Sequence, residues 1–281
     1  MSRPNQKRLF RNATQRRKRV IAFGWYGGKY SHLDFILPNL PYGEEHFCDV
    51  FGGSAAVLIN RKPAPVETYN DLDSELVNFF EVLRNDDTRL IKAISLTPFS
   101  REELVKACTP EFGLSKLERA RRFYVRARQT RTGLAQTSSE GRWAHCVLTS
   151  RAGMAGAVSR WLGSIDGLPE IVQRLQRVQI ENAPAIEVIQ RYDTPKTLFY
   201  VDPPYVHESR NDSKAYGHEM TDRDHTELAL VLNNIKGRAV VSGYTNALYD
   251  RLFANWNRID ADEKLCNSSK SVRRESLWVN F

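Results

Sequence analysis

An apolar run at Leu198–Val201 is followed at once by the motif Asp202–Tyr205, which reads Asp-Pro-Pro-Tyr. The run predicts a buried strand, and the two prolines must end it because proline cannot donate to the ladder of a central strand. A carboxylate (Asp202), a carbonyl (Pro203) and a phenol ring (Tyr205) are thereby fixed at the carboxyl end of a strand, where open α/β sheets bind ligands. The plainer interpretation is a proline-stopped strand with an aspartate in its turn.

Strand and helix patterns alternate along most of the chain. Short apolar runs predict strands, and apolar residues at helical spacing predict helices between them. This alternation predicts an α/β fold, with helices on both faces of an open sheet. The expected strands are 47–51, 66–70, 198–201, 239–242 and 276–281, and the expected helices begin near residues 55, 72 and 221.

Residues 85–184 break this alternation, because they are polar, rich in arginine and mostly helical in their spacing. Within them, Arg119, Arg122 and Arg126 project from the face opposite an apolar stripe of one predicted helix. We therefore expect a catalytic domain built from residues 21–84 and 185–281, with a helical insert over 85–184.

The positive charge of the chain is concentrated near its start. The sequence has 41 basic and 33 acidic side chains, a net charge of +8, and residues 1–20 hold eight basic groups and no acidic one. We expect a basic disordered leader, which is either a solvated tail, an arm that attracts nucleic acid or, less simply, a transit peptide. No apolar run is long enough to cross a membrane. Four scattered cysteines and unpatterned histidines predict a reducing, cytoplasmic setting and no metal.

Two motifs follow the first two predicted strands. The segment 49–54, Asp-Val-Phe-Gly-Gly-Ser, has small residues that let a backbone approach a ligand closely, although a tight strand-to-helix turn needs the same residues. About 20 residues later, Asp71 stands where dinucleotide-type folds hold ribose hydroxyls. The alternative role in this turn is that of a helix N-cap, which suits Asp73 better than Asp71.

Near the start of the first half-domain, Trp25–Lys29 offers two aromatic rings, a glycine pair and a lysine, suited either to clamping a small charged ligand or to a hydrophobic turn. Taken together and in order, these motifs resemble the D12-class adenine-specific DNA methylases, which are relatives of the Dam methylase. The resemblance covers about residues 21–281. It rests on Trp25–Lys29, Phe51–Ser54, Asn70–Asp71, the 85–184 insert and Asp202–Tyr205.

The resemblance implies a Rossmann-like methyltransferase sheet with an inserted helical target-recognition subdomain. It also implies transfer of a methyl group from S-adenosyl-L-methionine to the N6 amine of an adenine flipped out of duplex DNA, with S-adenosyl-L-homocysteine as product and no metal. In such an enzyme, Asp202 and the Pro203 carbonyl accept hydrogen bonds from the target amine, and Tyr205 stacks on the base. The implied donor-binding residues are Trp25, Tyr26, Gly28, Lys29, Asp49, Phe51, Gly53, Ser54, Asp71 and Asp202.

The chain departs from the family pattern in two places. Ala55 stands where many relatives have a second glycine, and we expect its methyl group to crowd the donor pocket slightly. In the insert, Thr132 replaces a family asparagine and arginines replace aromatic residues, which leaves the recognised DNA sequence open. The expected DNA-binding residues are Arg119, Arg122, Arg126, Arg128 and Arg131, of which Arg128 or Arg131 should reach a base edge.

Several alternatives stay open on the sequence alone. A methylase of RNA adenine or of the cytosine amine shares the Asp-Pro-Pro-Tyr motif, and a non-catalytic DNA-binding relative shares the fold. The biological role is equally open between a partner of a restriction endonuclease, phage self-protection and an orphan regulator. In each case we expect the protein to act in the cytoplasm of a bacterium or of a phage host.

Overall fold

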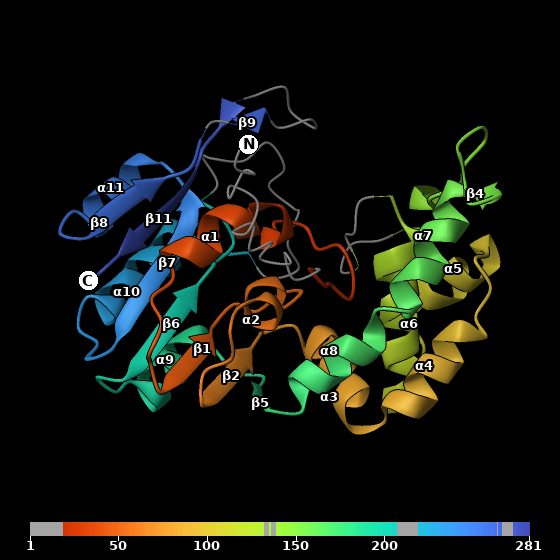
Figure 1. Cartoon of the computed structure of the whole chain (residues 1–281), viewed down its shortest axis with the longest axis horizontal. Coiled ribbons are helices and arrows are strands. Elements are labelled where there is room, and N and C mark those ends of the chain that lie inside the picture. The colour runs from red at the N-terminus through yellow and green to blue at the C-terminus, as the bar shows by residue number, and fades with distance from the viewer. Residues whose placement is uncertain (1–18, 132–134, 136–138, 207–218, 263, 266–271) are drawn as a thin grey trace, which may run out of the picture.

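The computed structural model describes residues 19–131, 135, 139–206, 219–262, 264–265 and 272–281. Its centre is a seven-stranded sheet of order β5-β2-β1-β6-β7-β11-β8 (Figure 1). The five strands from β5 to β7 are parallel, and β11 is antiparallel to both of its neighbours. The strands are β1 (His46–Asp49), β2 (Val66–Asn70), β5 (Val178–Glu181), β6 (Thr197–Val201), β7 (Arg238–Tyr244), β8 (Asn257–Asp260) and β11 (Glu275–Val279).

Helices cover both faces of this sheet. In β6, Leu198 and Tyr200 pack into one hydrophobic cluster and Phe199 and Val201 into another, because successive side chains of a strand point to opposite faces. The strand is buried at every position, which is why its sequence is apolar without alternation. The first cluster includes α1 (Leu33–Asn39), α2 (Ala56–Asn60), α3 (Ser74–Asn85) and α8 (Leu168–Leu175), and the second includes α9 (Ala185–Tyr192), α10 (Asp222–Leu232) and α11 (Ala247–Leu252).

The predicted α/β architecture is therefore confirmed. The strands expected at 66–70 and 198–201 are present, and β6 ends at Val201, directly before the two prolines. Thr221 caps α10 in a reciprocal capping box with Asp224, at the helix start that the sequence indicated. No helix in the described part of the chain is long and apolar enough to span a membrane.

The insert is a helical layer on one side of the sheet domain (Figure 1). Its central helix α6 packs on α3 and on the two helices before it, and Tyr124 of α6 stacks on Phe79 of α3 with ring centroids 5.6 Å apart. A short hairpin, β3 and β4, leads into α7. The elements are α4 (Asp87–Ser95), α5 (Arg101–Cys108), α6 (Lys116–Gln129), η2 (Glu140–Arg142), β3 (Ser150–Arg151), β4 (Met154–Ala155) and α7 (Gly156–Ile165).

The expected insert boundary at residue 184 is too late. Val178–Glu181 forms β5, which pairs in parallel with β2 at the edge of the sheet. The preceding helix α8 also lies on the sheet domain, because it packs on α2 and α3 and its Arg174 pairs with Glu67 of β2. An edge strand of only four residues, with one fully buried position, has too short an apolar pattern to be separated from helical sequence around it.

At the amino ends of β1 and β2, four buried charged side chains form a group that we term the balanced cluster: Glu44, Arg61, Glu67 and Arg174. Arg61 pairs with Glu44, and its Nη1 lies 3.7 Å from Oε1 of Glu67. Arg174 of α8 binds both carboxylate oxygens of Glu67 and the carbonyl of Leu58. Two cations thus face two anions, so that this cluster joins α8 to the sheet without excess charge.

Candidate active site

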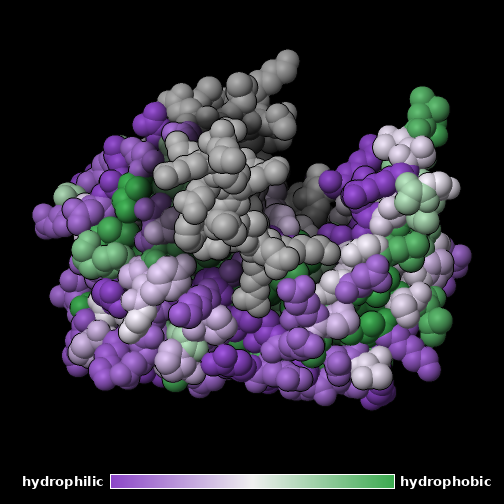
Figure 2. Space-filling view, viewed as in Figure 1, coloured by the Kyte–Doolittle hydropathy of each residue, from purple (hydrophilic) through white to green (hydrophobic). Residues whose placement is uncertain are grey.

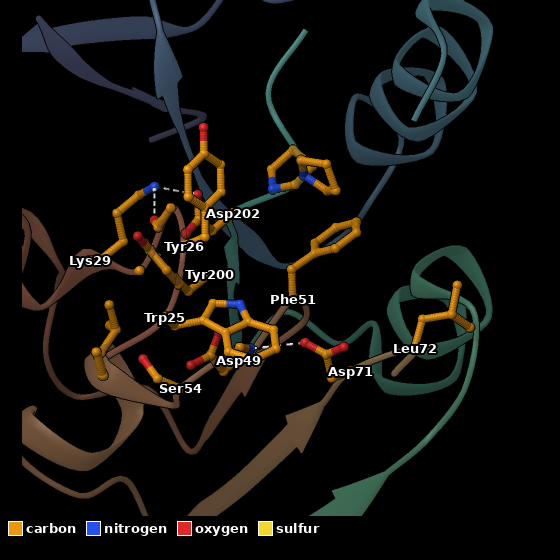
Figure 3. A pocket seen from close by; sticks show the side chains of 18 of the residues that line it. Trp25, Tyr26, Lys29, Asp49, Phe51, Ser54, Asp71, Leu72, Tyr200 and Asp202 are labelled. Atoms are coloured by element: carbon orange, nitrogen blue, oxygen red, sulfur yellow. Dashed lines mark hydrogen bonds and ion pairs between the residues drawn. The ribbon is translucent and has the colours of Figure 1, made fainter. Parts of the chain in front are cut away.

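A cavity opens at the carboxyl ends of β1, β2 and β6 (Figure 3). Strand β1 lies between β2, the next strand along the chain, and β6, which follows only after the insert, so the loops leave β1 and β6 in different directions. This is the switch point at which doubly wound sheets bind ligands. The cavity is lined by parts of the loop 25–29, the segment 49–54, Asp71 and the segment 202–204, and also by Ala56, Val57, Leu72, Tyr200, Glu219 and Met220.

The glycine loop after β1 is shaped by close contacts that exclude side chains. A Cβ atom on Gly52 would lie 2.1 Å from Cε2 of the Tyr69 ring, and one on Gly53 would lie 3.0 Å from Cδ1 of Trp25. The Tyr69 hydroxyl also donates to the Gly53 carbonyl at 2.8 Å. The glycine pair is therefore required by packing and places the loop backbone against the cavity.

Ala55 is buried and does not line the cavity, so the expected crowding of the donor pocket is wrong. The methyl group instead strains the backbone, because Ala55 has φ 56° and ψ 25°, in the left-handed region that favours glycine. The family's glycine at this position suits the conformation, and this chain adopts it with an alanine.

The two aspartates after β2 divide the roles that the sequence left open. Asp73 caps α3 by accepting from the main-chain N–H groups of Glu75 and Leu76. Asp71 lines the cavity, where its Oδ2 accepts from the Gly53 N–H at 2.9 Å and its Oδ1 accepts from the Asp73 N–H at 2.9 Å. The N-cap interpretation of Asp73 is thus confirmed, and Asp71 is held rigidly at the cavity wall.

Asp49 is fully buried on the cavity wall, and its Oδ1 has no hydrogen-bond partner among the described residues. Burial, with the nearby charges of Asp202 and Asp71, raises the pKa of this carboxyl well above its usual value. A buried carboxyl oxygen of this kind needs a proton or a ligand that brings a donor or a positive charge.

Asp202 is anchored through one of its two carboxylate oxygens. Lys29 Nζ lies 2.7 Å from Oδ1, and the Ser242 hydroxyl donates to the same atom at 2.9 Å. Tyr200 in turn donates to Ser242 at 3.0 Å. No hydrogen bond reaches Oδ2 from the part of the chain that the structure describes, so this oxygen is available to a ligand.

Lys29 is the single cation of a second buried charge group, which we term the unbalanced cluster: Lys29, Asp202 and Glu275. Glu275 Oε1 lies 3.5 Å from Lys29 Nζ. Burial lowers the pKa of Lys29, but the two carboxylates outweigh burial and hold that pKa well above its usual value. Burial raises the pKa of Asp202 to about 6, with Lys29 opposing the rise and Glu275 adding to it.

Tyr205 lies differently from what its expected stacking role requires. It is 7% exposed, does not line the cavity, and packs on Tyr244 with ring centroids 4.5 Å apart. Its hydroxyl contacts Lys29 and donates to both oxygens of Glu275 at 3.2–3.3 Å. In this conformation the ring supports the unbalanced cluster, and stacking on a base stays a prediction that requires the ring to move.

The cavity thus combines carboxylates at the switch point of the sheet with the first three residues of the Asp-Pro-Pro-Tyr motif. The sequence model of one family, described as D12 class N6 adenine-specific DNA methyltransferase, matches residues 25–266. The chain belongs to this family. No curated protein matches the chain.

The protein is thus an adenine-specific DNA methyltransferase, and S-adenosyl-L-methionine is its methyl donor. The predicted family, reaction and donor are confirmed, and methylation of RNA or of cytosine is set aside. The residues present fit this donor, which carries a positive sulfonium: the cavity lining holds four carboxyl groups, those of Asp49, Asp71, Asp202 and Glu219, and one lysine. Among the described residues, no group of three or more His, Cys, Asp or Glu side chains is arranged to hold a metal.

Several insert arginines of the methyltransferase form bonds within the protein, which the sequence did not indicate. Arg119 pairs with Glu75 of α3 at 2.5 Å, which fixes α6 to the sheet domain. Arg122 pairs with Glu118 of its own helix at 2.9 Å, and Arg126 donates to two main-chain carbonyls. These three side chains stabilise the insert, and their contact with DNA stays a prediction.

Arg128 and Arg131 lie at and beyond the carboxyl-terminal end of α6. Arg128 is partly buried and donates to the carbonyl of Arg160 at 3.1 Å, whereas Arg131 is exposed and lies 3.0 Å from a ring nitrogen of His145. Thr132 and Gly133 of the adjoining loop, like residues 1–18 of the leader, lie outside the described residues. Figure 2 shows a hollow beside the projecting end of the insert.

Sequence reasoning missed Glu275, Ser242 and Tyr200 as members of the site. Glu275 and Ser242 lie on strands that follow the insert and meet Asp202 only through the pairing of β7 with β6 and β11. The one available signal was a charged residue at the start of an otherwise buried strand, because an acidic side chain is seldom buried without a partner.

Proposed function

We propose that Asp202 is the residue that holds and activates the adenine amine of the target base. The observation that carries this proposal is the division of its carboxylate: Oδ1 is occupied by Lys29 and Ser242, while Oδ2 receives no hydrogen bond within the described chain. The Pro203 carbonyl is the second acceptor, held beside it by the rigid proline pair.

The chemistry requires such acceptors because the lone pair of an aromatic amine is delocalised into its ring. Hydrogen bonds from both amine hydrogens to Asp202 and Pro203 favour a tetrahedral nitrogen and localise the lone pair on it. When bound, the donor supplies an electrophilic methyl group, which the nitrogen takes as the sulfur leaves with the bonding pair. Asp202 is ionised above pH 6 and is therefore able to accept the proton that the nitrogen loses.

The donor is held, in this proposal, on the opposite wall of the cavity. Asp71 is fixed by two main-chain N–H groups and binds the ribose hydroxyls, while Asp49 faces the positive charge. Lys29 acts through Asp202, because its ammonium is committed to the unbalanced cluster. The remaining donor contacts are assigned to six residues that line the cavity: Trp25, Tyr26, Gly28, Phe51, Gly53 and Ser54. All of them except Ser54 offer the cavity either an aromatic ring or glycine backbone.

DNA is assigned to the hollow beside the projecting end of the insert. Arg131 is the arginine whose exposure best suits a base edge, with Arg128 beside it and the basic leader binding phosphates without regard to sequence. We also propose a restriction endonuclease as partner, which would cut the unmethylated form of the DNA sequence that this chain modifies. Both would act in the cytoplasm of a bacterium or of a phage host.

Asp202→Ala tests the proposal. We expect methyl transfer to unmethylated duplex DNA to fall about 10²–10³-fold, because one preorganised acceptor is lost, while S-adenosyl-L-homocysteine binding by calorimetry stays within a few fold. Nucleoside analysis of wild-type reactions should give N6-methyladenine. The matched control is Asp250→Ala, which removes a surface aspartate paired with Arg258. Retention of more than a few per cent of the rate by Asp202→Ala contradicts the assigned role.

A further inference from the structure

Strand β11 brings a carboxylate into the active site from the carboxyl-terminal end of the sequence. Glu275 is its first residue and pairs with Tyr244, the last residue of β7, so the antiparallel direction of β11 places it at the edge where the parallel strands end. Its side chain is 1% exposed. Both its oxygens accept from the Tyr205 hydroxyl, and Oε1 also faces Lys29.

A purely structural need does not explain this residue. A buried carboxylate is costly to desolvate, and an apolar side chain of similar size generally stabilises a strand as well or better. The cluster also has one cation for two carboxylates, and burial raises the pKa of Glu275 itself. The excess charge lies next to the cavity, since Glu275 Oε1 is 3.5 Å from Nζ of Lys29, and Lys29 and Asp202 both line that cavity.

We propose that Glu275 is a positioning residue for methyl transfer, which fixes Lys29 and Tyr205 and shares the lysine charge so that Asp202 stays a strong acceptor. This inference rests on the proposed role of Asp202. If Glu275 lost its charge, Lys29 would pair with Asp202 alone and withdraw electron density from the carboxylate that must bind the amine.

The charged and titratable surroundings of Asp202 make this effect visible in a pH profile. Among them, Lys29 lowers the pKa of Asp202 and Glu275 raises it, so loss of the Glu275 charge should lower that pKa. The groups facing Asp202 from the elements around it are Lys29 (η1, Lys29–His32), Asp49 (β1), Tyr200 (β6), Ser242 (β7), Tyr249 (α11) and Glu275 (β11).

The experiment compares Glu275→Gln with wild type, because glutamine keeps the size and the acceptor oxygen but removes the charge. We expect kcat at neutral pH to fall about tenfold, a part of the roughly 10²–10⁴-fold that a general base contributes, with S-adenosyl-L-homocysteine affinity within threefold. The acidic limb of kcat/KM should move to lower pH, so that the two profiles converge under acid conditions. Glu275→Asp keeps the charge on a shorter side chain, so its acidic limb should lie between those of Glu275→Gln and the wild type.

Ser276→Ala is the matched control on the same strand, since it removes a hydrogen bond to Asp260 outside the cluster and should leave the profile unchanged. A loss of rate in Glu275→Gln that is equal at every pH, or an unchanged rate, overturns the proposal. If Glu275→Gln fails to fold, the same limb measured in Glu275→Asp decides: an unshifted limb with a tenfold loss would likewise overturn it. Activity retained in Asp202→Ala would instead refute the role of Asp202, which separates the two failures.

Discussion

The two buried charge clusters lie at opposite ends of the parallel strands of one sheet, and they differ in net charge. At the amino ends of β1 and β2, Arg61 and Arg174 face Glu44 and Glu67, so the charges cancel. At the carboxyl ends, Lys29 alone faces Asp202 and Glu275. In the first cluster two cations match two anions, although Oε2 of Glu44 and Nε of Arg174 have no hydrogen-bond partner among the described residues. The second cluster has one cation for two carboxylates, and its Lys29 and Asp202 line the cavity at the switch point.

This difference separates a charge group that holds the fold together from one that performs chemistry. A buried pair with all its partners is expensive to break, since removal of one member leaves the other uncompensated. A buried group with excess charge destabilises the fold by itself and is retained where a ligand supplies the missing charge. In the function that we propose for this methyltransferase, the donor brings the missing positive charge and the adenine amine brings the missing hydrogen-bond donor.

The largest expected effect comes from breaking the balanced cluster. Arg174→Met keeps the length of the side chain but removes the cation that binds both carboxylate oxygens of Glu67. We therefore expect the free energy of unfolding to fall by about 3 kcal/mol. Denaturant titration measures it, with Arg191→Met as the control because Arg191 pairs with Glu181 at the surface. The folded Arg174→Met protein should methylate DNA at the wild-type rate. A comparable loss of rate would show that the two clusters are not separate.

A smaller effect is expected from pH, and it should act on activity and stability in opposite directions. Asp202 has a pKa of about 6 in the folded protein, above its usual value, so its active, ionised form is lost as pH falls below 6 and kcat/KM should drop tenfold per pH unit there. The folded state binds more protons than the unfolded one below that pH, so the Asp202 contribution to stability rises as pH falls through 6. Rate profiles and unfolding curves on the same buffers measure both. A rate that is flat down to pH 4 would contradict the assignment.

Many features of the fold and of the site could be predicted from the sequence because they depend on residues that are adjacent in the chain. The strand before Asp202, the cap at Asp73 and the glycine loop each follow from a few adjacent residues. Their order along the chain was enough to indicate the family and the cavity. The position of Asp71 at the cavity wall followed from the rule that parallel strands end at one edge.

The charge clusters could not be read in this way because they depend on pairing across the sheet. Glu275 and Lys29 are separated by almost the whole chain, and only the position of β11 next to β7 brings them together. The ion pair of Arg119 could not be predicted for the same reason, because Arg119 meets Glu75 only where α6 packs on α3. The edge strand β5 could not be predicted because its four residues are too few to show a strand pattern.

The most direct test of the contrast is the equilibrium unfolding of Asp202→Asn beside wild type at pH 8, without donor or DNA. Above pH 6 the ionised Asp202 carboxylate costs the fold stability, and asparagine removes that charge while Lys29 keeps Glu275 as its partner. We predict that Asp202→Asn is at least as stable as wild type although it is nearly inactive. A loss of about 3 kcal/mol, as expected for the balanced cluster, would show that Asp202 holds the fold together and would contradict the account.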